Sequence, residues 1–201
     1  MPPYDALMAT VPTFPVTGDS AADELNVRDP LALLTGMLLD QQIPMEKAFH
    51  SPFDLQERLG HPLDARRIAE MDPERLLELF RQRPALHRFP GSMGKRVQAM
   101  CAHLVEHHDG KAESVWLDAA DGADLFRRLR AIPGYGEEKS RIFVALLAKR
   151  MGVRPVGWEE AAGPFADSTP RSVADIDSRE AFATVRKWKQ EQKAKGRSKS
   201  E

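Results

Sequence analysis

Ile132-Pro133-Gly134-Tyr135-Gly136 is the stretch that decides the fold, because it separates two segments with helical periodicity. On either side of it, apolar residues recur at steps of three and four, the spacing of one helix face: Leu125, Phe126 and Leu129, then Ile142, Phe143, Leu146 and Leu147. Glycine tolerates a positive φ and lets another backbone approach closely. We therefore expect two helices, together spanning about 123–151, joined by a tight turn in which a β-branched residue at Gly134 or Gly136 would be strained.

The start of the second helix is where this turn could bind a ligand. The first N–H groups of a helix have no partner within it and lie at the positive end of the helix dipole. Such groups readily bind a phosphate oxygen. The turn therefore predicts a contact with a phosphate backbone that does not read base sequence. A plain corner of two helices with a glycine turn fits the same residues and remains the alternative.

The composition is that of a soluble globular protein. The chain has 201 residues, 42% hydrophobic and 29% charged, enough for one ordinary domain or two very small ones. Its net charge of −1 gives no global support for nucleic-acid binding, so any such surface must be local. The chain opens without a basic and then apolar leader, and no apolar run approaches membrane-spanning length, so we expect a cytoplasmic protein.

The chain shows helical patterns and no convincing strand, so we expect an all-α fold. Residues 1–28 are rich in proline and small polar residues, and we interpret them as an extended N-terminal arm. Asp29-Pro30 is a helix-start signature, and the apolar run 31–39 that follows predicts a buried central helix. A helical domain then spans 29–192, and the basic tail 193–201 is expected to be flexible.

The remaining helices follow from start signals and periodicity. We expect one opening at Pro44 and passing through Phe49, and short ones over 64–71 and from Asp72 to about 81. The clearest pattern covers 92–108, and a last helix covers about 179–192.

Several landmarks occur in an order that resembles a known superfamily. Leu38-Leu39-Asp40-Gln41-Gln42 ends a buried helix, Gly94-Lys95-Arg96 precedes Cys101 in a later helix, and the Ile132–Gly136 turn follows. This order is similar to the HhH-GPD superfamily of base-excision DNA glycosylases related to endonuclease III, and closest to the small HhH-GPD-type repair proteins common in actinobacteria. The resemblance covers about 29–160. It implies a bilobal helical fold with a helix-hairpin-helix motif, which clamps double-stranded DNA and flips a damaged base into the cleft between its lobes.

The resemblance also implies which residues would bind DNA. Gln42 falls where the relatives have a glutamine that reaches into the base stack, although its side chain could instead cap the helix that Pro44 opens. The hairpin residues match one by one: Ile132, Pro133, Gly134, Tyr135 and Gly136. Bifunctional members carry a Schiff-base lysine where this chain has Glu138. Lys139 lies one residue later, about 100° around the helix, so we expect it to face phosphate or solvent and expect no lyase activity.

The catalytic carboxylate is where the sequence departs from the family pattern. The resemblance implies an aspartate one helix and one loop after the hairpin, which stabilises the cationic sugar or activates water. The corresponding stretch 154–160 contains no aspartate. Glu159 is the nearest replacement, Glu160 is the second choice, and Asp40 beside Gln42 is a third candidate. Both glutamates could equally be acids of a first helical turn, where the dipole favours them.

No metal or cofactor is expected. A single cysteine, Cys101, excludes an internal disulfide and a four-cysteine iron–sulfur cluster. His103 and His107 have the spacing of a pair that can bind one metal, and His108 follows them. The histidines do not share the apolar face of Cys101, so we expect no metal site.

Two functions fit these residues best. The first is a monofunctional DNA N-glycosylase, which hydrolyses the bond between a damaged base and deoxyribose. The second is a non-catalytic, glycosylase-like module that binds distorted DNA, and in either case we expect a monomer. A helical scaffold for other proteins is a third alternative. The first two readings differ in whether Glu159 or Glu160 points into the cleft beside Gln42.

Overall fold

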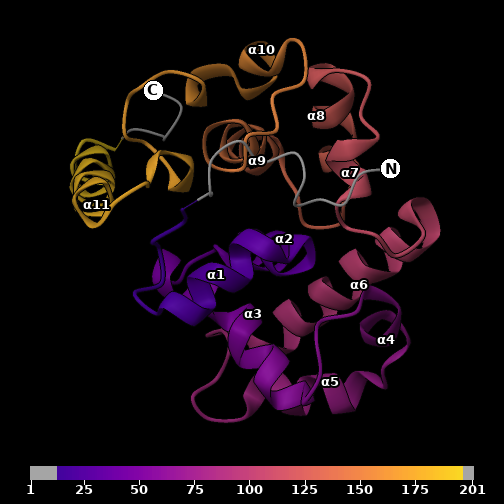
Figure 1. Cartoon of the computed structure of the whole chain (residues 1–201). Helices are drawn as coiled ribbons and strands as arrows, with labels where there is room; N and C mark the ends of the chain where they lie inside the picture. The colour runs from indigo at the N-terminus through magenta and orange to yellow at the C-terminus, as the bar shows by residue number, and fades with distance from the viewer. Residues whose placement is uncertain (1–12, 197–201) are drawn as a thin grey trace.

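The computed structural model describes residues 13–196 as helices joined by short loops, with no strand in this part of the chain (Figure 1). The predicted all-α class is therefore confirmed. None of these helices is long and apolar enough to cross a membrane. Residues 1–12 of the expected arm and 197–201 of the expected tail lie outside the described residues.

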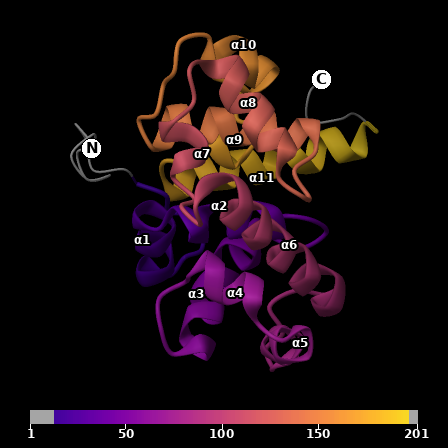
Figure 2. The same ribbon diagram turned by 90° about the vertical axis from the view of Figure 1, so that its right-hand side faces the viewer.

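The helices form two groups that follow one another along the chain and are stacked in both views (Figures 1 and 2). The first group comprises α1 (Ser20–Arg28), α2 (Pro30–Leu39), α3 (Met45–Leu59), α4 (Ala65–Glu70), α5 (Pro73–Arg81) and α6 (Pro90–His108). The second comprises α7 (Ser114–Leu117), α8 (Gly122–Ala131), α9 (Glu137–Arg150), α10 (Trp158–Ala162), the 3₁₀ turns η2 (Gly163–Phe165) and η3 (Val173–Asp175), and α11 (Arg179–Ala194).

Side-chain caps explain why many helices begin where the sequence predicted. Asp29 accepts from the Leu31 and Ala32 N–H groups at 2.9 and 3.2 Å. Asp64 and Asp72 cap α4 and α5 in the same way. An N-cap carboxylate satisfies a donor that the helix itself cannot and contributes about 1 kcal/mol. These local bonds confirm the starts predicted at 29–30 and 72–73.

The α2 helix is the buried centre, as expected from its apolar sequence. All residues from Leu31 to Leu39 are buried, and α2 packs mainly on α3. In both views α9 of the second group lies next to α2 (Figures 1 and 2). α2 is therefore one place where the two groups of helices meet; α11 and α3 meet as well, through Arg186 and Glu46.

The expected extended N-terminal arm, 1–28, is wrong for its last nine residues. Residues 20–28 form α1, capped by the Asp19 carboxylate, which accepts from the Ala21 N–H at 2.8 Å. The helix is fixed by burial of Leu25 and by Asn26, whose amide donates to the Phe49 carbonyl of α3 at 2.8 Å. This partner lies 23 residues away, so the local sequence gave little sign of it. The expected tail is wrong at its start, because α11 continues to Ala194.

Candidate nucleic-acid interface

The hairpin between α8 and α9 is a tight turn seated on α2. The Tyr135 N–H donates to the Ile132 carbonyl at 3.0 Å and closes the turn. Gly134 has φ +90°, and a Cβ there would lie 2.5 Å from Leu38 Cδ1. Both backbone conformation and the approach to α2 therefore require glycine at 134, as the sequence predicted.

Two of the predicted hairpin residues are part of the core. Ile132 and Tyr135 are 2% and 3% exposed. The Tyr135 hydroxyl donates to the Leu34 carbonyl of α2 at 2.7 Å, and burial raises the pKa of this phenol well above its usual value. Their side chains anchor the hairpin to α2, so the surface open to a ligand consists of Pro133, Gly134 and the Gly136 backbone.

The expectation that Gly136 needs a positive φ is wrong. Gly136 has φ −76° and ψ 175°, an extended backbone that any residue can adopt. A Cβ at this position would meet no protein atom within 4 Å. Gly136 is the N-cap of α9, and no side-chain hydrogen bond caps that helix. Among residues 13–196, a side chain at position 136 would therefore have open space beside the start of α9.

Lys139 does not point where the sequence predicted. Its ammonium donates to the Met37 carbonyl and, at 3.1 Å, to the Leu38 carbonyl. These carbonyls belong to the last turn of α2, which has no further helical N–H groups to satisfy them. Lys139 is therefore half-buried and fastens α9 to α2 instead of facing phosphate or solvent.

Gln42 lies in the loop between α2 and α3, next to this contact. It is exposed and has φ +57°, which is uncommon for a residue with a side chain. The alternative in which it caps α3 does not hold, because no side-chain hydrogen bond caps that helix. Its neighbour Gln41 donates to the Leu38 carbonyl at 2.6 Å and accepts from Arg96 of α6 at 2.8 Å. The loop is thus fixed to α2 and α6.

Glu159 and Glu160 lie on α10, away from Gln42. α10 packs on α8 and α9, and in both views α9 lies between α10 and α2 (Figures 1 and 2). Both glutamates are exposed. Glu160 lines a pocket of about 440 Å³ beside Phe126 and Arg141. The structure therefore does not bring either glutamate together with Gln42, the arrangement that the glycosylase interpretation needed.

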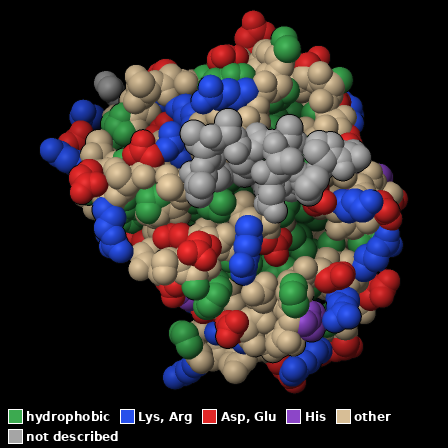
Figure 3. Space-filling view, viewed as in Figure 1, with side chains coloured by type: hydrophobic (Ala, Val, Ile, Leu, Met, Phe, Trp, Pro, Cys, Tyr) green, Lys and Arg blue, Asp and Glu red, His purple; other side chains and the backbone are tan. Residues whose placement is uncertain are grey.

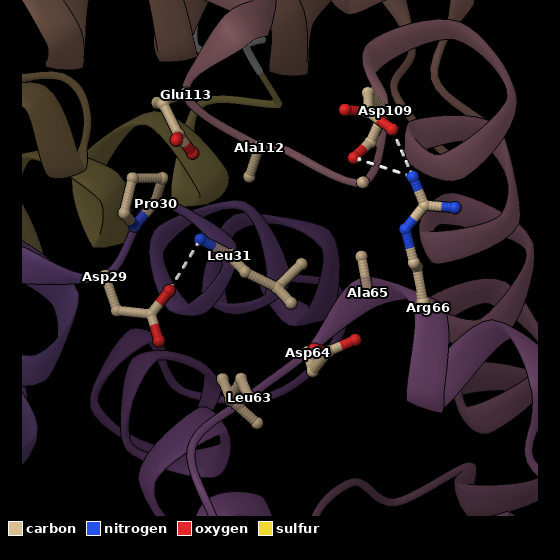
Figure 4. Close-up of a pocket in the computed structure, with 11 residues that line it drawn as sticks. Asp29, Pro30, Leu31, Leu63, Asp64, Ala65, Arg66, Asp109, Ala112 and Glu113 are labelled. Atoms are coloured by element: carbon tan, nitrogen blue, oxygen red, sulfur yellow. Dashed lines mark hydrogen bonds and ion pairs between the residues drawn. The ribbon is translucent and has the colours of Figure 1, made fainter.

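A second pocket of about 250 Å³ gathers several acidic side chains (Figure 4). Asp29 and Asp64 there cap α2 and α4, and Asp109 pairs with Arg66. Burial raises the pKa of Asp29, and the nearby Glu113 adds to that shift. Because most of these carboxylates have structural partners, this pocket is explained by helix capping.

The histidines near the end of α6 cluster without forming a metal site. The His103 ring centroid lies 4.4 Å from that of His107 and 5.9 Å from that of His108. Partial burial lowers the pKa of His103 and of His108. Cys101 is fully buried and separate from them. Among residues 13–196, no group of three or more histidine, cysteine or acidic side chains could hold a metal ion.

Charge on the face seen in Figure 3 is mixed, with lysine and arginine interspersed among acidic side chains. The hairpin itself has a local cation: Arg130 is exposed and donates to the Tyr135 carbonyl at 3.5 Å. The Glu137 carboxylate pairs with the guanidinium of Arg141, one turn further along α9, with an N–O distance of 3.1 Å.

Comparisons with protein-family models, curated proteins and solved structures found no match. Function must therefore be inferred from the geometry of these residues.

His87 is the residue of this region that the sequence did not single out. It is 2% exposed, and its Nε2 lies 2.9 Å from the carbonyl oxygen of Gln41, 46 residues earlier. A single histidine three residues before Pro90 matches no motif that predicts a role for it. Its partner, Gln41, is distant in sequence. Only the folded chain brings the two together.

Proposed function

We propose that this chain binds the phosphate backbone of duplex DNA through the α8–α9 hairpin, as a glycosylase-like DNA-binding module. The observation that carries the proposal is the start of α9, which no N-cap side chain caps; among residues 13–196, a Cβ on its N-cap Gly136 would meet no neighbouring atom within 4 Å. The positive end of a helix dipole favours an anion. The landmarks shared with the HhH-GPD superfamily make DNA the anion we infer.

The charges at the hairpin are mixed: Arg130 favours a phosphate, whereas the acidic Glu138 in the first turn of α9 opposes one. Arg130 lies at the hairpin and is exposed. Glu137 would repel a phosphate at the start of α9, but its carboxylate is paired with Arg141. Gln42, exposed in the adjoining α2–α3 loop, is placed to contact DNA beside the hairpin. We infer that the hairpin provides most of the affinity and that Gln42 senses distortion.

Gly136→Val is expected to leave the fold intact and to weaken DNA binding strongly. The valine finds open space and an allowed φ in the protein, but its methyl groups occupy the place of the bound phosphate. Binding of a labelled duplex, measured over a range of salt concentrations, checks this.

The affinity of the wild type for DNA should fall with salt. The logarithm of the association constant should decrease linearly with the logarithm of the salt concentration, with a slope of about 0.9 for each phosphate that the protein neutralises.

The matched control is Ala99→Val, which adds the same side chain at an exposed position of α6. It should bind DNA like the wild type. Wild-type affinity in a folded Gly136→Val protein would show that the hairpin does not hold DNA. An affinity independent of salt would rule out backbone-dominated binding.

Hydrolysis of a base–sugar bond is the second candidate function, and Asp40 is the carboxylate we assign to it. Asp40 is half-buried at the C-terminal end of α2, two residues before Gln42. This position favours it over Glu159 and Glu160, which lie beyond α9 on α10. Because position 138 is a glutamate and Lys139 is bonded to α2, the product would be an intact abasic strand.

Asp40→Asn should reduce base release by about 10²–10³ while leaving DNA binding unchanged, since removal of a group that stabilises developing charge typically costs this much. A panel of lesion-containing duplexes measures the release. Glu159→Gln and Glu160→Gln are the controls and should retain full activity. Reduced release in either of them, with Asp40→Asn fully active, would move the assignment back to α10. A wild type that releases no base from any lesion would leave only the binding function.

A further inference from the structure

Gln42 adopts a backbone conformation that needs support from elsewhere. Its φ of +57° is unfavourable for a residue with a Cβ and persists only where the surroundings fix it. Gln42 itself is exposed, so the support comes from residue 41. The Gln41 side chain bonds to α2 and α6, as described above, and its carbonyl is held by His87 at 2.9 Å.

The hydrogen bonds of His87 define one neutral form of its ring. The Phe89 N–H donates to Nδ1 at 3.1 Å, so Nδ1 is an acceptor and carries no proton. Nε2 must then carry the hydrogen and donate it to the Gln41 carbonyl. A second proton on Nδ1 would face the Phe89 N–H, and this bond would be lost. A protonated ring would keep its bond to the Gln41 carbonyl but lose the one from the Phe89 N–H, so only a neutral imidazole joins the α2–α3 loop to the residues that precede α6 through both bonds.

The surroundings of His87 disfavour its protonation. Burial lowers the pKa of His87 below its ordinary value. The charged groups that act on the ring are Arg88 beside it and Arg96 on α6, and both repel an added positive charge. The Leu39 carbonyl at the end of α2 and the Gln41 carbonyl of the α2–α3 loop favour the charged form, but burial is the largest influence and the pKa is lowered.

We infer that His87 is a positioning residue: in its neutral form it holds the loop in the conformation that presents Gln42 to distorted DNA. This inference rests on the proposed DNA-binding function and deepens it. The hairpin contacts phosphates. His87 acts through Gln41 and Gln42, and it determines how much more tightly the protein binds distorted DNA than a regular duplex. Because the pKa of His87 is lowered, the neutral form is retained near neutral pH and lost as the solution becomes acidic.

The experiment measures the ratio of affinities for two duplexes of the same sequence, one fully paired and one with a single abasic site. The variants are Gln42→Ala, His87→Phe, which keeps a ring but has no polar atoms, and His87→Gln, whose amide can donate to the Gln41 carbonyl. We expect His87→Phe to lose about two- to tenfold of the preference, the size of one oriented hydrogen bond, as Gln42→Ala does. His87→Gln should retain it. The affinity for the paired duplex should be unchanged in the two His87 variants, because His87 is buried and is not part of the proposed DNA contact.

The pH profile separates this role from a merely structural one. Because the pKa of His87 is lowered, the preference of the wild type should persist through the ordinary histidine pKa of about 6.5 and fall only at more acidic pH, whereas that of His87→Gln should stay constant. The ratio of affinities is the quantity to follow, because a change in general electrostatic attraction alters the affinity for both duplexes alike and cancels in the ratio. If His87→Phe does not fold, the comparison of wild type with His87→Gln still decides.

The outcomes distinguish this inference from the function on which it rests. A preference that persists in folded His87→Phe, or the same acid dependence in His87→Gln and wild type, overturns the positioning role alone. Absence of binding to either duplex, or binding that survives Gly136→Val, overturns the hairpin function and the inference with it.

Discussion

Gly134→Val is expected to lower the free energy of unfolding by about 2–5 kcal/mol. A left-handed backbone costs a residue with a Cβ about 1–2 kcal/mol, and overpacking against α2 costs about 1–3 kcal/mol more. Gly134 has φ +90°, and its Cβ would lie 2.5 Å from Leu38 Cδ1. The turn would have to lift from α2, which would also weaken the Tyr135 and Lys139 bonds to that helix. Denaturant unfolding followed by circular dichroism measures the change.

Gly136→Val is the matched control for Gly134→Val, two residues further along the same turn. Its φ is −76° and its Cβ would meet no protein atom within 4 Å, so the fold should keep its stability. The pair therefore separates folding from binding: position 134 is constrained by α2, whereas position 136 would be constrained by a ligand. Equal stability losses in the two variants would contradict this division.

Gly122→Val is expected to destabilise the fold by about 1–3 kcal/mol, the usual range for overpacking, with more if the backbone cannot adjust. The obstacle here is backbone, since a Cβ on Gly122 would lie 2.5 Å from the Gly157 carbonyl oxygen and 2.7 Å from the Trp158 nitrogen. The Gly122 N–H also donates to the Val156 carbonyl at 2.8 Å. A side chain at 122 would thus separate α8 from the start of α10. Thermal unfolding checks this.

Gly91→Ala provides the control for Gly122, because Gly91 also lies in the first turn of a helix. A Cβ there would make an ordinary contact, 3.7 Å from Leu77 Cδ1. Alanine should leave stability unchanged or raise it by up to about 1 kcal/mol, as expected when a helical glycine is replaced. If Gly122→Val unfolded at the same temperature as the wild type, the close approach of α8 and α10 would be wrong.

The fixed approach of Gly122 to Gly157 also explains why Glu159 and Glu160 lie apart from Gln42. It holds the start of α10 against α8, so that Glu159 and Glu160 follow on the side of α9 that faces away from α2. Counting residues from the hairpin gave the position of these glutamates along the chain. Their position in space depends on the path of the loop 152–157. This loop packs on the start of α8 through backbone contacts, such as the hydrogen bond from the Gly122 N–H to the Val156 carbonyl, which cannot be predicted from a pattern of side chains.

The sequence by itself determined the helical class, most helix boundaries and the need for glycine at 134. These depend on interactions within a few residues: apolar spacing, and carboxylates that cap the next turn, such as Asp29 and Asp72. Only the tertiary structure decided the directions of Lys139 and Tyr135 and the support of Gln42 by His87. Lys139 and Tyr135 bond to carbonyls 101 or 102 residues away, and His87 to one 46 residues away. A backbone carbonyl accepts from whichever donor the packing brings to it, so these partners become known only when the helices are in place.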